Sequence, residues 1–148
     1  ILTTLSANIV KKLGYKDLRL TMHSGTSYES SIKMVSSYTL PYTSLNEVNY
    51  MVFGEVTEEY HDELYSYLYS NKTDEVRWIE EYINGKPTVN YIRELQNGST
   101  KEEQKTLTEK IRHQIHHPEN CHNAPYTEAD IRQSIEDMRT FIMNKRES

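Results

Sequence analysis

Residues 99–118 read STKEEQKTLTEKIRHQIHHP, and the fold prediction rests on them. Ser99 and Glu102 match a capping box, in which each side chain accepts a hydrogen bond from the other residue's backbone amide. Pro118 cannot continue a helix, and it disfavours helical geometry at the residue before it. The stretch therefore predicts one amphipathic helix that begins after Ser99 and ends at Pro118. Its core-facing residues recur at intervals of four: Leu107, Ile111 and Ile115.

Helical patterns also lie on both sides of this stretch. Ser44 with Glu47, and Thr127 with Asp130, form capping patterns, and each precedes apolar residues at helical spacing. Three more helices are predicted from these starting points: Thr57, Thr73 and Val89, the last ending at Asn97 and Gly98. The last helix should face the core with these residues: Ile131, Ile135, Met138 and Ile142. We therefore predict a mainly α fold, an antiparallel bundle of four or five helices preceded by a small amino-terminal β-containing segment.

The amino-terminal residues have a different composition, rich in serine and threonine and poor in acidic residues. Residues 18–22 and 32–35 alternate with period two around a turn-like cluster, which predicts a β-hairpin. Residues 5–14 predict a short helix closed by a glycine. We assign residues 1–43 to a small α/β appendage or the tail of an upstream domain, and residues 44–148 to the helical bundle.

Composition limits the possible functions. The 148 residues carry a formal net charge of −5, which argues against a broad, non-specific nucleic-acid binder but leaves room for a local site. No apolar run approaches the ~18 residues of a membrane span, so we expect no membrane partner. The single cysteine, Cys121, suits a reducing cytosol, and we expect a cytoplasmic protein. His61 precedes two acidic residues, and we expect it on an exposed helix face.

The end of the 99–118 helix carries the most reactive side chains: Arg112, His113, His116 and His117. Three interpretations stay open. Histidines near a helix carboxyl terminus favour the helix dipole and can cap its carbonyl groups. A metal site would use His113, His116, His117, Cys121 and His122, although their spacing matches no closed zinc pattern. A phosphodiester site would use the arginine to stabilise phosphate charge and a histidine to transfer protons, with no metal required.

Helix geometry separates these side chains. Arg112 and His116 are four residues apart, so they should share one face of the helix. His117 lies five residues from Arg112 and directly before Pro118. We expect His117 to leave the helix at that point and to turn towards the Arg112 side.

The stretch from Arg112 to Pro118 resembles the R-x₄₋₆-H motif of the HEPN superfamily, with Arg112 as the motif arginine and His117 as the motif histidine. His113 stands where that family most often has asparagine. The resemblance implies an all-α bundle and a metal-independent endoribonuclease that acts on RNA without a cofactor. It implies Arg112 and His117 as catalytic residues, and we expect His116 to act with them and His113 to support them. Asn120 could orient the histidines as a further supporting residue, or it could simply make a turn, as could Asn123. It also implies a homodimer whose active cleft lies across the interface, in a toxin or effector of an anti-phage or toxin–antitoxin system. Some members of the family are only binding or assembly domains, so a non-catalytic dimerisation or partner-binding domain remains the alternative.

A second resemblance concerns residues 40–50, LPYTSLNEVNY. They are similar to sequences that follow the ATPase core in bacterial ABC-like or AAA-like defence ATPases. Since the chain begins with Ile1 rather than methionine, we expect an upstream ATPase domain or an ATPase partner. Residues 25–27 lack the glycine spacing and lysine of a phosphate-binding loop, so this piece should not bind ATP alone.

Overall fold

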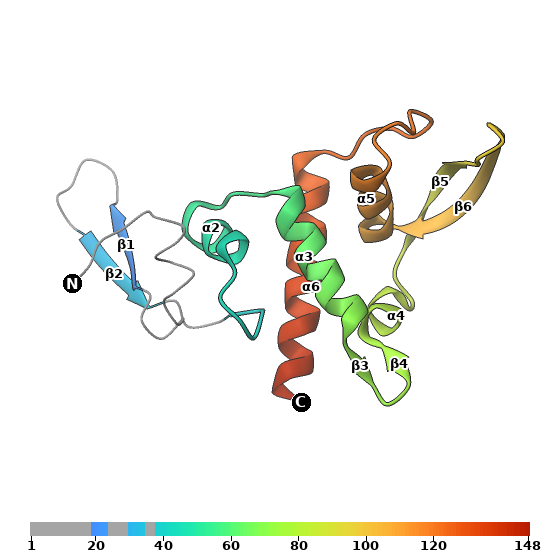
Figure 1. Ribbon diagram of the computed structural model, residues 1–148. Coiled ribbons are helices and arrows are strands. Elements are labelled where there is room, and N and C mark those ends of the chain that lie inside the picture. The colour runs from blue at the N-terminus through green and yellow to red at the C-terminus, as the bar shows by residue number, and fades with distance from the viewer. Residues whose placement is uncertain (1–18, 24–29, 35–37) are drawn as a thin grey trace. The chain divides into compact units, whose positions relative to one another are not determined.

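The computed structural model describes residues 19–23, 30–34 and 38–148, and it divides into two compact units, residues 1–55 and 56–148 (Figure 1). The described residues combine helices with two-stranded antiparallel sheets. In chain order the elements are β1 (Arg19–His23), β2 (Ser30–Met34), α2 (Leu45–Phe53), α3 (Glu58–Ser70), β3 (Lys72–Thr73), β4 (Val76–Arg77), α4 (Trp78–Ile83), β5 (Thr88–Glu94), β6 (Thr100–Thr106), α5 (Leu107–His116) and α6 (Glu128–Glu147). In this part of the chain, no helix is both long and apolar enough to cross a membrane.

The prediction of a mainly α bundle is wrong, because the chain has a mixed α/β fold. The helix predicted from Val89 is strand β5, and the first turns of the helix predicted after Ser99 are strand β6. The two strands pair antiparallel from Thr88 opposite Thr106 to Glu94 opposite Thr100. The turn between them is closed by Gly98, whose φ of 78° is the left-handed conformation that glycine adopts without strain.

Helix α5 begins at Leu107, and its capping box is formed by Thr106 and Glu109 rather than by the predicted Ser99 and Glu102. The Thr106 hydroxyl accepts a hydrogen bond from the Glu109 amide, and the Glu109 carboxylate accepts one from the Thr106 amide. The S-x-x-E pattern at Ser99 and the T-x-x-E pattern at Thr106 look alike in sequence. Pairing with β5 decides between them, because residues 100–106 find backbone partners across the hairpin.

The helix predicted from Thr73 is replaced by a tight hairpin. Strands β3 and β4 pair through Lys72 opposite Arg77 and Thr73 opposite Val76. Asp74 occupies the turn with φ 53°, a left-handed conformation that aspartate tolerates better than most residues. Helix α4 therefore begins only at Trp78.

In the first unit, β1 and β2 form the predicted antiparallel hairpin. Helix α2 begins as predicted, since the Ser44 hydroxyl accepts a hydrogen bond from the Glu47 amide at 3.2 Å. The buried Glu47 carboxylate accepts a hydrogen bond from the Thr39 amide at 2.7 Å, which ties the preceding segment to the helix. The helix predicted over residues 5–14 lies outside the described residues.

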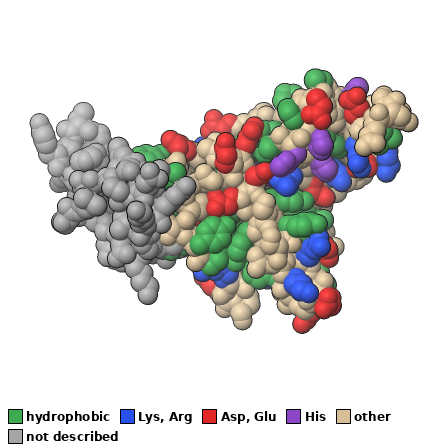
Figure 2. All heavy atoms as spheres, viewed as in Figure 1, with side chains coloured by type: hydrophobic (Ala, Val, Ile, Leu, Met, Phe, Trp, Pro, Cys, Tyr) green, Lys and Arg blue, Asp and Glu red, His purple; other side chains and the backbone are tan. Residues whose placement is uncertain are grey.

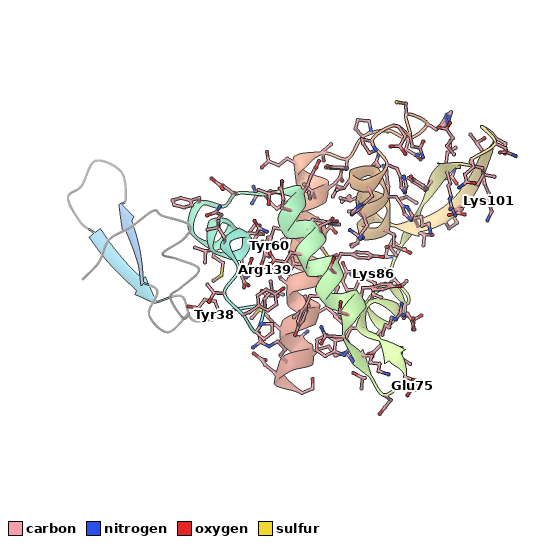
Figure 3. The ribbon with its side chains drawn as sticks, viewed as in Figure 1. Tyr38, Tyr60, Glu75, Lys86, Lys101 and Arg139 are labelled. Carbon is pink, nitrogen blue, oxygen red and sulfur yellow. The ribbon has the colours of Figure 1, made fainter. Side chains whose placement is uncertain are left out.

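The core of the second unit lies between α3, α5 and α6. Helices α3 and α6 pack along each other, and α5 packs against both (Figure 1). Arg139 on α6 also donates a hydrogen bond to the Tyr60 hydroxyl on α3 at 2.6 Å (Figure 3). The predicted core face of the final helix is confirmed. The buried leucine, isoleucine and methionine side chains of these three helices are Leu64, Leu68, Ile111, Ile131, Ile135, Met138 and Ile142.

A buried chain of polar side chains crosses this core. The His61 Nε2 atom lies 3.0 Å from the Ser134 hydroxyl, which lies 2.7 Å from the Thr108 hydroxyl, which lies 2.9 Å from the Tyr82 hydroxyl. These hydrogen-bonded side chains thereby join α3, α6, α5 and α4. The prediction that His61 is exposed is wrong, because its side chain is fully buried and Asp62 takes the outward position. Burial lowers the pKa of His61 from about 6.5 to about 4.

Candidate phosphate-binding site at the end of helix α5

Four of the five predicted site residues, Arg112, His113, His116 and His117 but not Asn120, line one hollow in the second unit. Its volume is about 620 Å³, and it opens between the carboxyl end of α5 and one face of α3. Figure 2 shows histidine side chains gathered next to basic ones on this unit. The side chains lining the hollow are Tyr65, Ser66, Tyr69 and Ser70 from α3, and Arg112, His113, His116 and His117 from α5 and its cap.

Arg112 is held in place by two residues of α3. Its Nη1 atom donates a hydrogen bond to the Asp62 Oδ1 atom, and its guanidinium lies over the Tyr65 ring, 4.7 Å from the ring centroid. The Arg112 and Asp62 side chains are each 28% exposed, so water screens this ion pair less than one on the open surface. The sequence did not predict Asp62 as a site residue, because Asp62 and Arg112 are 50 positions apart and no local sequence pattern indicates their pairing.

His116 completes a three-residue network. Its Nε2 atom lies 2.7 Å from the Asp62 Oδ2 atom and also contacts the Arg112 Nη1 atom, so the prediction that Arg112 and His116 share a helix face is confirmed. A guanidinium can only donate, and an ionised carboxylate can only accept. The Nε2 atom therefore either donates a hydrogen bond to Asp62 or accepts a hydrogen bond from Arg112. These are two proton arrangements of one network.

His117 leaves the helix before Pro118, as predicted. Its φ and ψ are −132° and 61°, and its backbone amide donates to the His113 carbonyl oxygen at 2.9 Å as the helix cap. Its ring stacks on the His113 ring with centroids 6.3 Å apart, and its Nδ1 atom lies 3.2 Å from the Glu119 Oε1 atom. Within the described residues, no hydrogen bond joins His117 to Arg112, although both line the hollow.

His113 lies between strand β5 and the helix cap. Its ring is 5.2 Å from the Tyr91 ring on one side and stacks on His117 on the other. Burial lowers the pKa of His113, and the positive charge of Lys105 lowers it further. The lowered pKa favours the neutral ring, which suits His113 to positioning its neighbours.

Asn120 anchors the loop that follows the site. Its Nδ2 atom donates to the Tyr91 hydroxyl at 3.1 Å and to the Ile92 carbonyl oxygen at 2.9 Å, while its backbone amide donates to the His117 carbonyl oxygen at 3.0 Å. Asn123 accepts a hydrogen bond from the Ile92 amide at 2.8 Å. The two asparagines therefore fix the loop, and with it the His117 backbone, to β5.

The metal interpretation finds no matching geometry in the described part of the chain, where no three His, Cys, Asp or Glu side chains converge on one point. His122 turns towards Glu94, with 3.6 Å between the Nε2 and Oε2 atoms. Cys121 is exposed and contacts the Glu119 carbonyl oxygen.

Comparisons with protein-family models, with curated proteins and with solved structures find no match to this chain.

Proposed function

We propose that this chain is a HEPN-like, metal-independent endoribonuclease. One observation carries the proposal: Arg112, His116 and His117 line the same hollow, so a hydrogen-bond donor for phosphate and two proton-transfer groups border one space of about 620 Å³. The hollow is open to solvent on the described surface and wide enough for a phosphodiester with its ribose. That combination is what cleavage through the ribose 2′-hydroxyl requires.

Arg112 is the phosphate-binding residue in this proposal. Its contacts with Asp62 and His116 both use Nη1, and a guanidinium has five N–H donors. In the described part of the chain no other hydrogen bond to this guanidinium is found, so the Nε and Nη2 donors can bind non-bridging phosphate oxygens. Asp62 and Tyr65 then act as positioning residues that hold the guanidinium at the edge of the hollow.

The histidines move the protons. His117 removes the proton from the 2′-hydroxyl, the 2′-oxygen attacks phosphorus, and the bond from phosphorus to the 5′-oxygen breaks. His116, with its Nε2 atom protonated, donates that proton to the departing 5′-oxygen. The products are a 2′,3′-cyclic phosphate and a 5′-hydroxyl end. Water returns both histidines to their starting states between turnovers.

The setting of this activity is also part of the proposal. We place the enzyme in the cytoplasm, as a homodimer that joins two copies of the motif. It serves as a toxin or effector of an anti-phage or toxin–antitoxin system, together with an ATPase domain or partner. The lone cysteine supports the compartment, and the R-x₄-H motif and residues 40–50 support the rest.

The test is cleavage of RNA in the presence of a metal chelator. Arg112→Ala and His117→Ala should each lower the rate at least a hundredfold, which is the usual contribution of a charge stabiliser or a general base. His122→Ala is the matched control, because that histidine is similarly exposed but does not line the hollow. Wild-type rates in both site variants would overturn the assignment.

The second candidate is a non-catalytic dimerisation or partner-binding domain. The network of Asp62, Arg112 and His116 favours it, since these side chains already balance one another and join α3 to α5. This function predicts that Arg112→Ala alters assembly or thermal stability and that no RNA is cut under any condition. Sedimentation of the wild type and the variant, run beside the cleavage assay, separates the two functions.

A further inference from the structure

The two faces of the β5–β6 hairpin differ in charge. Side chains alternate between the two faces of a strand, and directly paired residues share a face. Arg93 pairs with Lys101, Tyr91 with Glu103, and Val89 with Lys105, so all six side chains lie on one face. Glu94 and Glu102 alternate with these residues and lie on the other face.

The first face carries a surplus of positive charge, although the whole chain is acidic. Arg93, Lys101 and Lys105 converge on the single carboxylate of Glu103, at 3.9, 3.2 and 3.5 Å. One carboxylate cannot neutralise three cations, so this group keeps a net charge of +2. Arg93 and Lys101 are more than half exposed, and Lys101 lies on the hairpin in open view (Figure 3).

This face adjoins the histidines of the candidate site. Tyr91, on the same face, is buried against the His113 ring, and the charges of Lys105 and Arg93 both act on His113. A second hollow of about 840 Å³ runs between the hairpin and the loop after α5. Its walls include Arg93, His113 and His117 and also the carboxylates of Glu94 and Glu119, whereas Lys101 and Lys105 do not line it. The two histidines therefore border both hollows, and Arg93 connects the second hollow to the basic face of the hairpin.

We propose that Arg93, Lys101 and Lys105 form a second phosphate-binding subsite, which holds the backbone of a single RNA strand on one side of the phosphate bound by Arg112. This inference rests on the proposed ribonuclease function and names its substrate class. An RNA strand that reaches from one hollow to the other passes over His113 and His117. The subsite binds and orients the strand and takes no part in the proton transfers.

The subsite is tested by neutralising two of its cations, Arg93→Gln with Lys101→Gln. Lys105 stays, so Glu103 keeps a partner and the hairpin keeps its ion pair. Binding is measured by fluorescence anisotropy with a 2′-O-methyl RNA of about 12 nucleotides, which binds without being cut. The slope of log K against log salt should fall by about 1.4, because each single-strand phosphate contact contributes about 0.7.

The matched control is Lys72→Gln with Arg132→Gln, which changes the net charge equally at two exposed positions away from both hollows. Its salt slope should equal that of the wild type. Cleavage provides a second readout. A dinucleoside monophosphate, which has only the scissile phosphate, should be cut equally by wild type and hairpin variant, whereas a longer RNA should show a raised KM in the variant.

The outcomes separate this inference from the proposed function. If the wild type cuts RNA but the hairpin variant and the control bind it with equal salt slopes, the subsite is wrong and the ribonuclease stands. Suppose instead that the wild type does not cut RNA, and that only the hairpin variant loses salt-dependent binding. The ribonuclease assignment is then wrong, and the hairpin is still an RNA-binding surface.

Discussion

Asp62 on α3 and Arg112 on α5 form an ion pair at the edge of the hollow, and His116 contacts both partners. The pair joins two helices of the core and fixes the direction of the guanidinium. It also places a carboxylate beside the position that we assign to phosphate. Asp62 is therefore both a positioning residue and a competitor of the substrate.

These two roles predict a distinctive result for Asp62→Asn. The amide keeps the shape of the side chain but removes the charge that competes with phosphate, so KM for a short RNA should fall. The kcat should also fall, because the guanidinium and the His116 proton lose their ionic partner. Steady-state kinetics with a short RNA checks both directions.

A purely structural ion pair would give another outcome. Asp62→Asn would then lower the thermal midpoint and leave KM unchanged. Glu63→Gln is the control, because it removes a neighbouring carboxylate of α3 that does not line the hollow. Unchanged KM and kcat in Asp62→Asn would contradict the positioning role.

The burial of His61 predicts how stability depends on pH. Its pKa is lowered to about 4 in the folded state, first by burial and then by the charge of Arg112, against the opposing effect of Asp62. The unfolded chain, with a pKa near 6.5, binds more protons between these values. His61 therefore has no effect on the pH dependence of stability above pH 6.5, and the free energy of unfolding falls by up to about 3 kcal/mol as the pH falls towards 4.

Urea unfolding at pH 7 and pH 4.5 measures this loss. His61→Gln keeps a side-chain amide that can bond to Ser134 and removes the titration, so its stability should change less between the two pH values. His122→Ala should retain the wild-type difference, because that histidine is half exposed. An equal pH dependence in His61→Gln and the wild type would contradict the prediction.

Ser134 is the central link of the buried polar chain. Ser134→Ala should destabilise the fold by about 1–3 kcal/mol, since it leaves the His61 Nε2 atom and the Thr108 hydroxyl without their shared partner. Thr140→Ala, on an exposed position of the same helix, should cost much less. Equal free energies of unfolding for the two variants would show that the chain of hydroxyls contributes little.

Local patterns predicted the elements whose ends depend on their own residues. The predicted caps at Ser44, Thr57 and Thr127 are confirmed, because each hydroxyl accepts a hydrogen bond from the backbone amide three residues later. The apolar spacing of the last helix likewise identified its buried face, including Ile135. Such signals survive because no distant segment competes for the same backbone groups.

The elements and site partners that the sequence did not predict depend on contacts between distant residues. Residues 100–106 contain no apolar side chain, so their periodicity cannot distinguish a strand from a helix, and only pairing with residues 88–94 decides it. The partnership of Asp62 with Arg112 and the burial of His61 depend in the same way on how α3 packs against α5 and α6. The spacing of Arg112 and His117 pointed to the candidate site, but the electrostatic partners of these residues depend on packing.

Gly98 gives the last prediction, because the hairpin and its basic face depend on the turn that this glycine closes. The Gly98 amide donates to the Leu95 carbonyl oxygen and the Leu95 amide donates to the Ser99 carbonyl oxygen, both at 2.8 Å. No atom lies within 4 Å of the position that a Cβ would take, so a substitution costs only backbone strain at φ 78°. Gly98→Ala should therefore destabilise the hairpin by about 1 kcal/mol, and Gly98→Asn by less, since asparagine tolerates this conformation. Amide hydrogen exchange across residues 88–106 measures the difference. Protection that is equal in wild type and both variants would show that cross-strand pairing, rather than the turn, holds the hairpin together.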